Sequence, residues 1–318
     1  MVDLSYLQAL VIGALQGVTE LFPISSLGHS VLVPALIGGS WQHLVTESST
    51  KNSAQSPYLA FVVALHVATA VALLAFYWHD WVRVIGDLAR TVRTRQIRTP
   101  GERFAWLIVL ATIPVGVIGL ALERQLRTVF AKPSYAAAFL FVNGLVLLAG
   151  ERLRRAAVAG TGPGGPGGSG GSGSSGSSGS SARGVPAAAT RRRVEDLSFR
   201  EAVVVGLFQA LALLAGISRS GITMVAGLQR GLDHEDAARF AFMLATPVIF
   251  AAGLLKLPTL AGSAGAGIHG QVLLGSFAAA VCAYASVKFL TRYFTTRTLT
   301  PFAVYCLSAG AACVLRFG

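Results

Sequence analysis

The stretch Pro57–Trp78 reads PYLAFVVALHVATAVALLAFYW and contains no Asp, Glu, Lys or Arg. A helix that crosses a bilayer needs about 20 consecutive, predominantly apolar residues. Five further stretches have a comparable apolar character: Phe104–Leu122, Ser134–Gly150, Ala237–Leu257, Gln271–Leu290 and Pro301–Leu315. Together the six stretches predict an all-α integral membrane protein that crosses the bilayer several times.

The composition of the whole chain supports this class. Charged residues make up 13% of the sequence, well below the roughly 25% of a soluble domain, and the mean hydropathy is +0.62. Cys282, Cys306 and Cys313 lie in apolar stretches without the spacing of a metal site or a disulfide framework, so we expect core residues. The first apolar segment lacks a basic leader and a cleavage site, so no cleavable signal peptide is expected.

The net charge of +12 is concentrated in three loops, residues 80–103, 151–197 and 291–300. Basic loops of membrane proteins stay in the cytoplasm, so we expect a multi-pass protein of the bacterial inner membrane with these loops inside. The bilayer, with its anionic headgroups, is one expected partner. Nucleic acid is not, because no basic run is interleaved with stacking aromatic residues.

One segment divides the chain. Residues Gly160–Gly184 consist almost entirely of Gly and Ser, and such a segment behaves as a flexible tether because it cannot bury apolar area. We therefore predict a first membrane repeat over residues 1–155, a flexible cytoplasmic insert over 156–194 and a second membrane repeat over 195–318.

The two halves share a pattern. Four residues of the first half recur in the second at one constant offset: Gln16, Ile24, Ser25 and Gly28 match Gln209, Ile217, Ser218 and Gly221. If the basic loops are cytoplasmic, both ends of segment 4–42 lie outside and both ends of segment 197–232 lie inside. Each segment must then enter the membrane and turn back. The sequence thus predicts two inverted repeats, each a re-entrant helical hairpin plus three transmembrane helices.

The tip of the first hairpin reads QGVTELFPISSLGH over Gln16–His29. Charged residues inside a membrane are expensive and indicate function by default. Glu20 lies four residues after Gln16, so both share one helix face until Pro23 breaks that helix. Beyond the break, hydroxyl and backbone N–H groups are suited to cradle a phosphate. We expect that cradle to consist of Ser25, Ser26 and Gly28, followed by His29.

The tip of the second hairpin reads GISRSGIT over Gly216–Thr223. Arg219 offers a rigid fork of donors suited to phosphate. An acid, a hydroxyl, an imidazole and an arginine are the groups needed to hydrolyse a phosphoanhydride. The candidate catalytic residues are Glu20, Ser26, His29 and Arg219. The candidate substrate-binding residues are Gln16, Ser25, Gly28, Ser218, Ser220, Gly221 and Thr223.

Both tips resemble the motifs of the undecaprenyl-diphosphate phosphatase family, the bacitracin-resistance phosphatases. The family's first motif is close to E-G-x-T-E-F-x-P-(V/I)-S-S-T-G-H and its second to P-G-x-S-R-S-G-x-T. The resemblance covers the chain except the Gly/Ser insert. It implies two inverted repeats and removal of the terminal phosphate from a polyprenyl diphosphate lipid, which recycles the carrier lipid of cell-wall synthesis. It also implies a divalent cation, Mg²⁺ or Ca²⁺, at Glu20.

The sequence departs from the family pattern at three positions. Gln16 stands at the first acidic position, and a neutral amide binds a hard cation less strongly than a carboxylate. Leu27 replaces the Thr and removes one hydroxyl. Ala215 replaces the Pro before Gly216.

Several alternatives remain open from the residues alone. The nucleophile is Ser26, a water or His29, and the base is Glu20 or His29. A lipid flippase would also suit inverted repeats and broken helices. A phosphatidic-acid type phosphatase is disfavoured, because its S-R-x5-H-x3-D element is missing after Arg219. A homodimer is left open, and the active site is expected to face the outer side.

Other polar residues have structural interpretations. His66 is expected to pack or to support a site residue, and His79 with Asp80 to lie in an interfacial belt. Asp233 and Asp236 are expected to cap and charge the start of a helix, so the run 234–236 is not an expected metal site.

Overall fold

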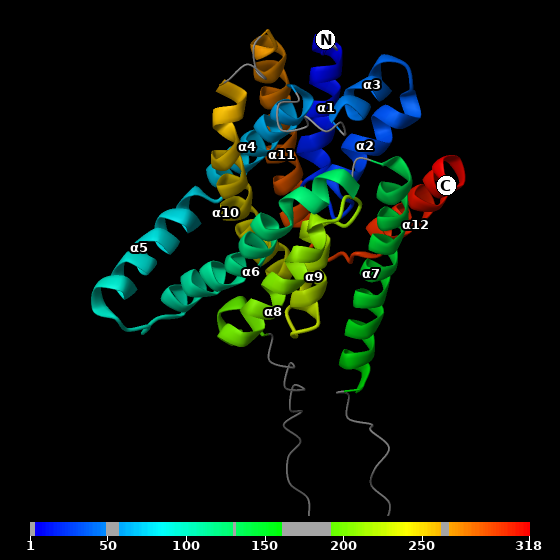
Figure 1. Ribbon diagram of the computed structural model, residues 1–318. Helices are drawn as coiled ribbons and strands as arrows, with labels where there is room; N and C mark the ends of the chain where they lie inside the picture. Colours follow the sequence, from blue (N-terminus) through cyan, green and yellow to red (C-terminus); the bar gives the residue numbers. More distant parts are fainter. Residues whose placement is uncertain (1–3, 49–56, 130–131, 161–191, 262–266) are drawn as a thin grey trace, which may run out of the picture.

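The computed structural model describes residues 4–48, 57–129, 132–160, 192–261 and 267–318 (Figure 1). Across these ranges the chain is helical and has no β-strand beyond an isolated bridge between Arg192 and Leu232. The α-helices are α1 (Tyr6–Thr19), α2 (Ser26–Ile37), α3 (Ser40–Ser48), α4 (Pro57–Phe76), α5 (Trp78–Thr94), α6 (Pro100–Val129), α7 (Pro133–Gly160), α8 (Phe199–Ala210), α9 (Arg219–Leu228), α10 (His234–Ala261), α11 (His269–Tyr293) and α12 (Thr300–Phe317). Two short 3₁₀ turns, η2 (Val194–Asp196) and η3 (Leu211–Leu213), flank α8. Most of the predicted insert lies outside the described residues.

The long apolar helices confirm a multi-pass α-helical membrane protein. In the described ranges, α6, α7, α10, α11 and α12 are each long and apolar enough to cross a bilayer. The predicted stretch Pro57–Trp78 corresponds to α4, which is followed by α5 after a bend of 85°. Asp80, placed in an interfacial belt by the sequence, forms an ion pair of 2.8 Å with Arg239 of α10 and so fixes the start of α5 against the bundle.

Four helices, α1, α2, α8 and α9, are each too short to span the membrane. They form the pairs α1–α2 and α8–α9, which correspond to the two predicted hairpins. In each pair a serine caps the second helix: the Ser25 Oγ accepts a hydrogen bond from Gly28 N, and the Ser218 Oγ accepts one from Gly221 N, both at 3.2 Å. Such caps satisfy backbone donors at a helix start. The two halves therefore use the same residue for the same purpose at matched positions.

The first helices of the two hairpins also start alike. Ser5 caps α1 and Ser198 caps α8, each in a reciprocal capping box with the residue three positions on, Gln8 and Glu201. The side chain of Arg192 binds Glu201 at 2.6 Å, and this contact lowers the pKa of the Glu201 carboxyl to about 2. Asp233 starts α10 in the predicted way, because its Oδ1 accepts from Asp236 N at 2.8 Å.

The hairpins exchange partners between the halves. Helix α1 packs along α11 of the second half, and α8 packs along α6 of the first (Figure 1). Glycines allow this close approach: a Cβ at Gly13 would overlap the backbone of Gly275, and a Cβ at Gly206 would overlap that of Ala111. Small residues of this kind let helix backbones meet in lipid. An exchange of this form suits two repeats related by a twofold axis, and the inverted arrangement itself stays a prediction.

The glycine contact between α8 and α6 can be tested with a matched pair of variants. Gly206→Ala places a methyl group against the Ala111 carbonyl and should destabilise the fold by about 1–3 kcal/mol through overpacking. Gly116→Ala, on α6, adds its methyl in open space and should leave stability unchanged or slightly higher, since Ala favours helix over Gly. Thermal unfolding of the purified variants in detergent measures both. Equal melting temperatures would contradict the packing described here.

Candidate active site

The tips of the two hairpins meet inside the bundle. The Ser25 Oγ accepts a second hydrogen bond from Gly216 N at 3.1 Å, which joins residues of opposite halves. A Cβ at Gly28 would lie 3.1 Å from the Gly216 Cα, and Gly216 itself has a φ of +115°. Ser25 has a φ of +71°, an uncommon conformation for a residue with a side chain. Ser25, predicted to bind substrate, is thus occupied in holding the two tips together.

Asn143 of α7 ties the same two tips from a third side. Its Nδ2 donates to the Pro23 carbonyl at 3.1 Å, and its Oδ1 accepts from Ser218 N at 3.0 Å. Its side chain is fully buried. Both backbone groups sit where a helix is broken, so they lack helical partners, and an unpaired buried group would cost about 1–3 kcal/mol. The amide supplies both missing hydrogen bonds at once.

The carboxylate of Glu20 is the centre of the polar cluster. Its Oε1 accepts from Arg219 Nη2 at 2.5 Å, across the hairpin interface. Its Oε2 accepts from Gln16 Nε2 at 3.0 Å and from the Ser26 hydroxyl. Glu20 is only 8% exposed. The ion pair and the hydrogen bonds offset the free-energy cost of burying its charge. Glu20 therefore contacts two other predicted catalytic residues directly, Ser26 and Arg219.

Two donors beside this cluster have no protein partner. Arg219 Nη1 and Thr223 Oγ1 are buried without a hydrogen bond in the described part of the chain. The Ser218 Oγ bonds the Ser220 Oγ at 3.1 Å and caps α9. The start of α9 also carries the positive end of the helix dipole. An orphaned guanidinium nitrogen and hydroxyl at such a place fit a bound oxyanion.

His29 lies apart from the Glu20 cluster. Its Nδ1 is 2.7 Å from the Ser25 carbonyl, and its Nε2 is 2.7 Å from the hydroxyl of Tyr305 on α12. The two rings are stacked, with centroids 5.7 Å apart. Within the described residues no hydrogen bond joins His29 to Glu20 or Ser26. The Ser25 carbonyl can only accept, so Nδ1 carries the proton and Nε2 receives the Tyr305 hydroxyl when the ring is neutral.

Known proteins resemble this chain over nearly its whole length. The family model described as "Bacitracin resistance protein BacA" matches residues 9–312. The chain belongs to this family. It is 60% identical to Undecaprenyl-diphosphatase 2 of Frankia alni, over 99% of this chain and 98% of that protein. It is 56% identical to the Undecaprenyl-diphosphatase of Mycolicibacterium paratuberculosis, over 97% of this chain and 96% of that protein, and equally to that of Mycobacterium avium, over 98% and 96%.

Sequence reasoning missed two residues of this BacA-family site, Tyr305 and Asn143, and left a third, His66, open between packing and support of a site residue. His66 of α4 places its Nε2 3.4 Å from Glu20 Oε2, so its neighbour is the catalytic candidate itself. Tyr305 and Asn143 come from α12 and α7. A signal was present for Asn143, a side-chain amide within an otherwise apolar span. None was present for Tyr305, because aromatic residues are common along membrane helices.

The side chains of the polar cluster decide whether a divalent cation can bind there. In the described residues no three His, Cys, Asp or Glu side chains cluster as a metal site. Glu20 is the one carboxylate of the polar cluster, and Gln16 contributes an amide. Mg²⁺ often binds through one or two carboxylates together with substrate phosphates. The residues of this BacA-family chain therefore fit a cation shared with a diphosphate, and they do not fit a site made by protein alone.

Proposed function

We propose that this protein is an undecaprenyl-diphosphatase, which removes the terminal phosphate of undecaprenyl diphosphate and leaves the monophosphate for reuse as a carrier lipid. The names of its close relatives support this activity. So does the site, which combines a buried carboxylate, a hydroxyl and an arginine at the junction of two hairpins in a membrane protein. The prenyl chain has apolar helix surfaces on which to lie.

One observation carries the proposal: among the residues that the structure describes, Arg219 Nη1 and Thr223 Oγ1 are buried donors without a hydrogen-bond partner. The guanidinium fork matches the geometry of phosphate oxygens. Arg219 is held in place by its other nitrogen, which binds Glu20. A preorganised donor stabilises charge on a transferring phosphoryl group without reorganising during the reaction.

The hydrogen bond from Ser26 to Glu20 supports the following mechanism. Glu20 takes the proton as the Ser26 Oγ attacks the terminal phosphorus, and the bond from that phosphorus to the bridging oxygen breaks. Undecaprenyl phosphate leaves, and water then hydrolyses the phosphoserine to release inorganic phosphate. Because Ser26 contacts Glu20 and has no hydrogen bond to His29 in the described chain, we assign the base to Glu20. His29, held by Tyr305, borders the site.

Glu20 and Gln16 are the residues that would hold a divalent cation together with the diphosphate. Such a cation would neutralise phosphate charge and orient the diphosphate. The chain's own contribution is the placement of its donors: Gln16 Nε2 fixes the Glu20 carboxylate from one helical turn away.

Lipid flipping without hydrolysis is the competing function. It is disfavoured because the close relatives are named as diphosphatases, and because a transporter has no need of a base on the Ser26 hydroxyl. Release of inorganic phosphate from undecaprenyl diphosphate by the purified protein separates the two functions.

We also propose an inner-membrane location with the first hairpin opening to the outer face, based on the basic loops. In a cysteine-free chain, His43→Cys in α3 should react with an impermeant maleimide added to intact cells. Gln96→Cys, between α5 and α6, should react only after the cells are opened. Both positions are exposed. The reverse labelling pattern would overturn the outward direction and leave the chemistry untouched.

Substitution of Arg219 tests the phosphate site. Arg219→Ala should lower the rate of phosphate release by about 100-fold or more, as expected when a preorganised donor to the transition state is lost. Arg219→Lys keeps the charge beside Glu20, and so the fold, but a point charge cannot replace the fork. It should also be strongly impaired.

Arg200→Ala is the matched control, because Arg200 is an exposed arginine of α8 in the same hairpin. It should retain near-normal hydrolysis. Size-exclusion profiles and melting temperatures report folding of all three variants. Near-normal turnover by well-folded Arg219→Lys protein would refute the role given to the guanidinium fork.

A further inference from the structure

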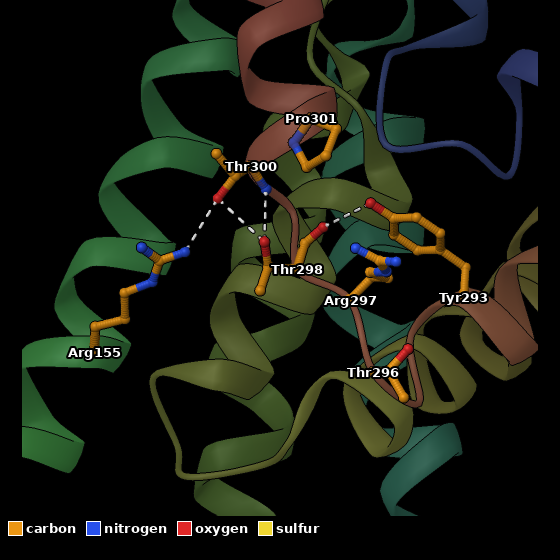
Figure 2. Close-up of a pocket in the computed structure, with 7 residues that line it drawn as sticks. All are labelled: Arg155, Tyr293, Thr296, Arg297, Thr298, Thr300 and Pro301. Atoms are coloured by element: carbon orange, nitrogen blue, oxygen red, sulfur yellow. Dashed lines mark hydrogen bonds between the residues drawn. The ribbon is translucent and has the colours of Figure 1, made fainter.

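A cavity lies outside the two hairpins. It has a volume of about 570 Å³ and lies between the last turns of α7 and the turn that joins α11 to α12 (Figure 2). This volume is within the ~300–1,000 Å³ of ordinary small-molecule sites. None of its lining residues belongs to α1, α2, α8 or α9, so the cavity is distinct from the Glu20 cluster.

The cavity is lined by donors and by two positive charges. Arg155 extends from α7 and donates from Nη2 to the Thr300 Oγ1 at 3.3 Å, and Thr300 in turn bonds the Thr298 hydroxyl (Figure 2). Arg297 projects from the turn itself, and its guanidinium makes no hydrogen bond or ion pair within the described residues. No lining residue carries a carboxylate. The lining is therefore basic and rich in hydroxyls.

The nearest carboxylate is already occupied. Glu151 of α7 binds Arg155 Nε through Oε1 at 3.3 Å and His234 Nε2 through Oε2 at 2.8 Å. Its side chain is almost fully buried behind Arg155. Glu151 holds the Arg155 guanidinium at Nε. The terminal nitrogens of Arg155, together with Arg297, remain available to a ligand. Helix α12 begins at this place as well, so its dipole adds to the positive potential.

A rigid aromatic wall closes one side of the cavity. The Tyr293 hydroxyl donates to the Thr298 carbonyl at 3.3 Å. The Tyr293 ring packs edge-on against Phe302 at 5.4 Å between centroids, and it also contacts Phe289 at 5.7 Å. These contacts fix the backbone of the turn that carries Thr298 and Arg297, so the Thr298 hydroxyl is held before any ligand arrives.

We infer that this cavity binds a phosphate-bearing anion, and that in the membrane the anion is the headgroup of an anionic phospholipid. The cavity lies in the region of the basic loops, which are expected at the cytoplasmic surface. Basic pockets between membrane helices at that surface suit phospholipid headgroups. An apolar side chain lies beside it in a position to contact an acyl chain: Phe289 of α11 is 52% exposed and contacts the ring of Tyr293. Free inorganic phosphate would use the guanidinium groups but not this apolar surface.

Arg297 is the residue to change, because its guanidinium has no hydrogen bond or ion pair to lose among the described residues. Arg297→Gln should weaken binding of dioleoylphosphatidylglycerol by about tenfold, the loss expected for one charge-assisted hydrogen bond. Arg297→Lys, which keeps the charge, should fall between this variant and the native chain. Arg292→Gln is the matched control: Arg292 is an exposed arginine at the end of α11 and does not line the cavity. Arg155 is unsuitable because its loss would strip buried Glu151 of a partner.

Native mass spectrometry of the full chain in detergent, titrated with dioleoylphosphatidylglycerol or dioleoylphosphatidylcholine, measures the first bound lipid. The expected result is a preference for phosphatidylglycerol that Arg297→Gln loses and Arg292→Gln keeps. Equal affinity of native and Arg297→Gln protein, or equal affinity for the two lipids, would overturn the inference. A third arm uses sodium phosphate as competitor. Phosphate alone could displace phosphatidylglycerol and raise the melting temperature as much as the lipid does, with both effects lost in Arg297→Gln. In that case the free ion is the ligand and the lipid assignment is wrong.

Discussion

The ion pair between Glu20 and Arg219 is the interaction on which the rest of the structure depends. It joins the two halves of the chain inside the bundle, with 2.5 Å between Glu20 Oε1 and Arg219 Nη2. Removing one partner of a buried ion pair typically costs about 3–5 kcal/mol, because the other charge is left unpaired. The hairpins must therefore meet at their tips. Four further residues hold the tips together or allow their close approach: Ser25, Gly28, Asn143 and Gly216.

The same constraint prepares the site for its substrate. Glu20 binds one terminal nitrogen of Arg219, and the other is buried without a partner in the described part of the chain. A phosphate oxygen can remove the cost of that unpaired donor. The carboxylate also accepts a hydrogen bond from the Ser26 hydroxyl and lies beside His66. One acidic side chain thus contacts Arg219, the proposed anion-binding group, Ser26, the proposed nucleophile, and the neighbouring His66 imidazole. In the proposed mechanism stability and catalysis depend on the same contacts, so the rate of each variant at this cluster should be measured together with its folding.

The sequence predicted the parts that local chemistry decides. Pro23 after an apolar helical run marked the break of the first hairpin, and the repeated Gln, Ile, Ser and Gly residues marked matched positions in the two halves. The capping role of Ser25 and Ser218 was learned from the structure. The capping role of Asp233 also followed from its local pattern and is confirmed.

Contacts between distant segments could not be predicted in this way. The partnership of His66 with Glu20, of Tyr305 with His29 and of Asn143 with both tips depends on how α4, α12 and α7 pack, which no local pattern encodes. The sequence left the base open between Glu20 and His29, and the hydrogen bond from Ser26 that favours Glu20 likewise required the structure.

The central claim is that Glu20 and Arg219 act as one unit in hydrolysis. A double-mutant cycle on kcat/KM for phosphate release from undecaprenyl diphosphate tests it most directly, with the native chain, Glu20→Gln, Arg219→Gln and the double variant, all checked for folding. Residues that act as a unit give strongly non-additive losses. The account predicts that the double variant is no worse than the poorer single variant. Losses that multiply would show that the two residues contribute independently and would contradict it.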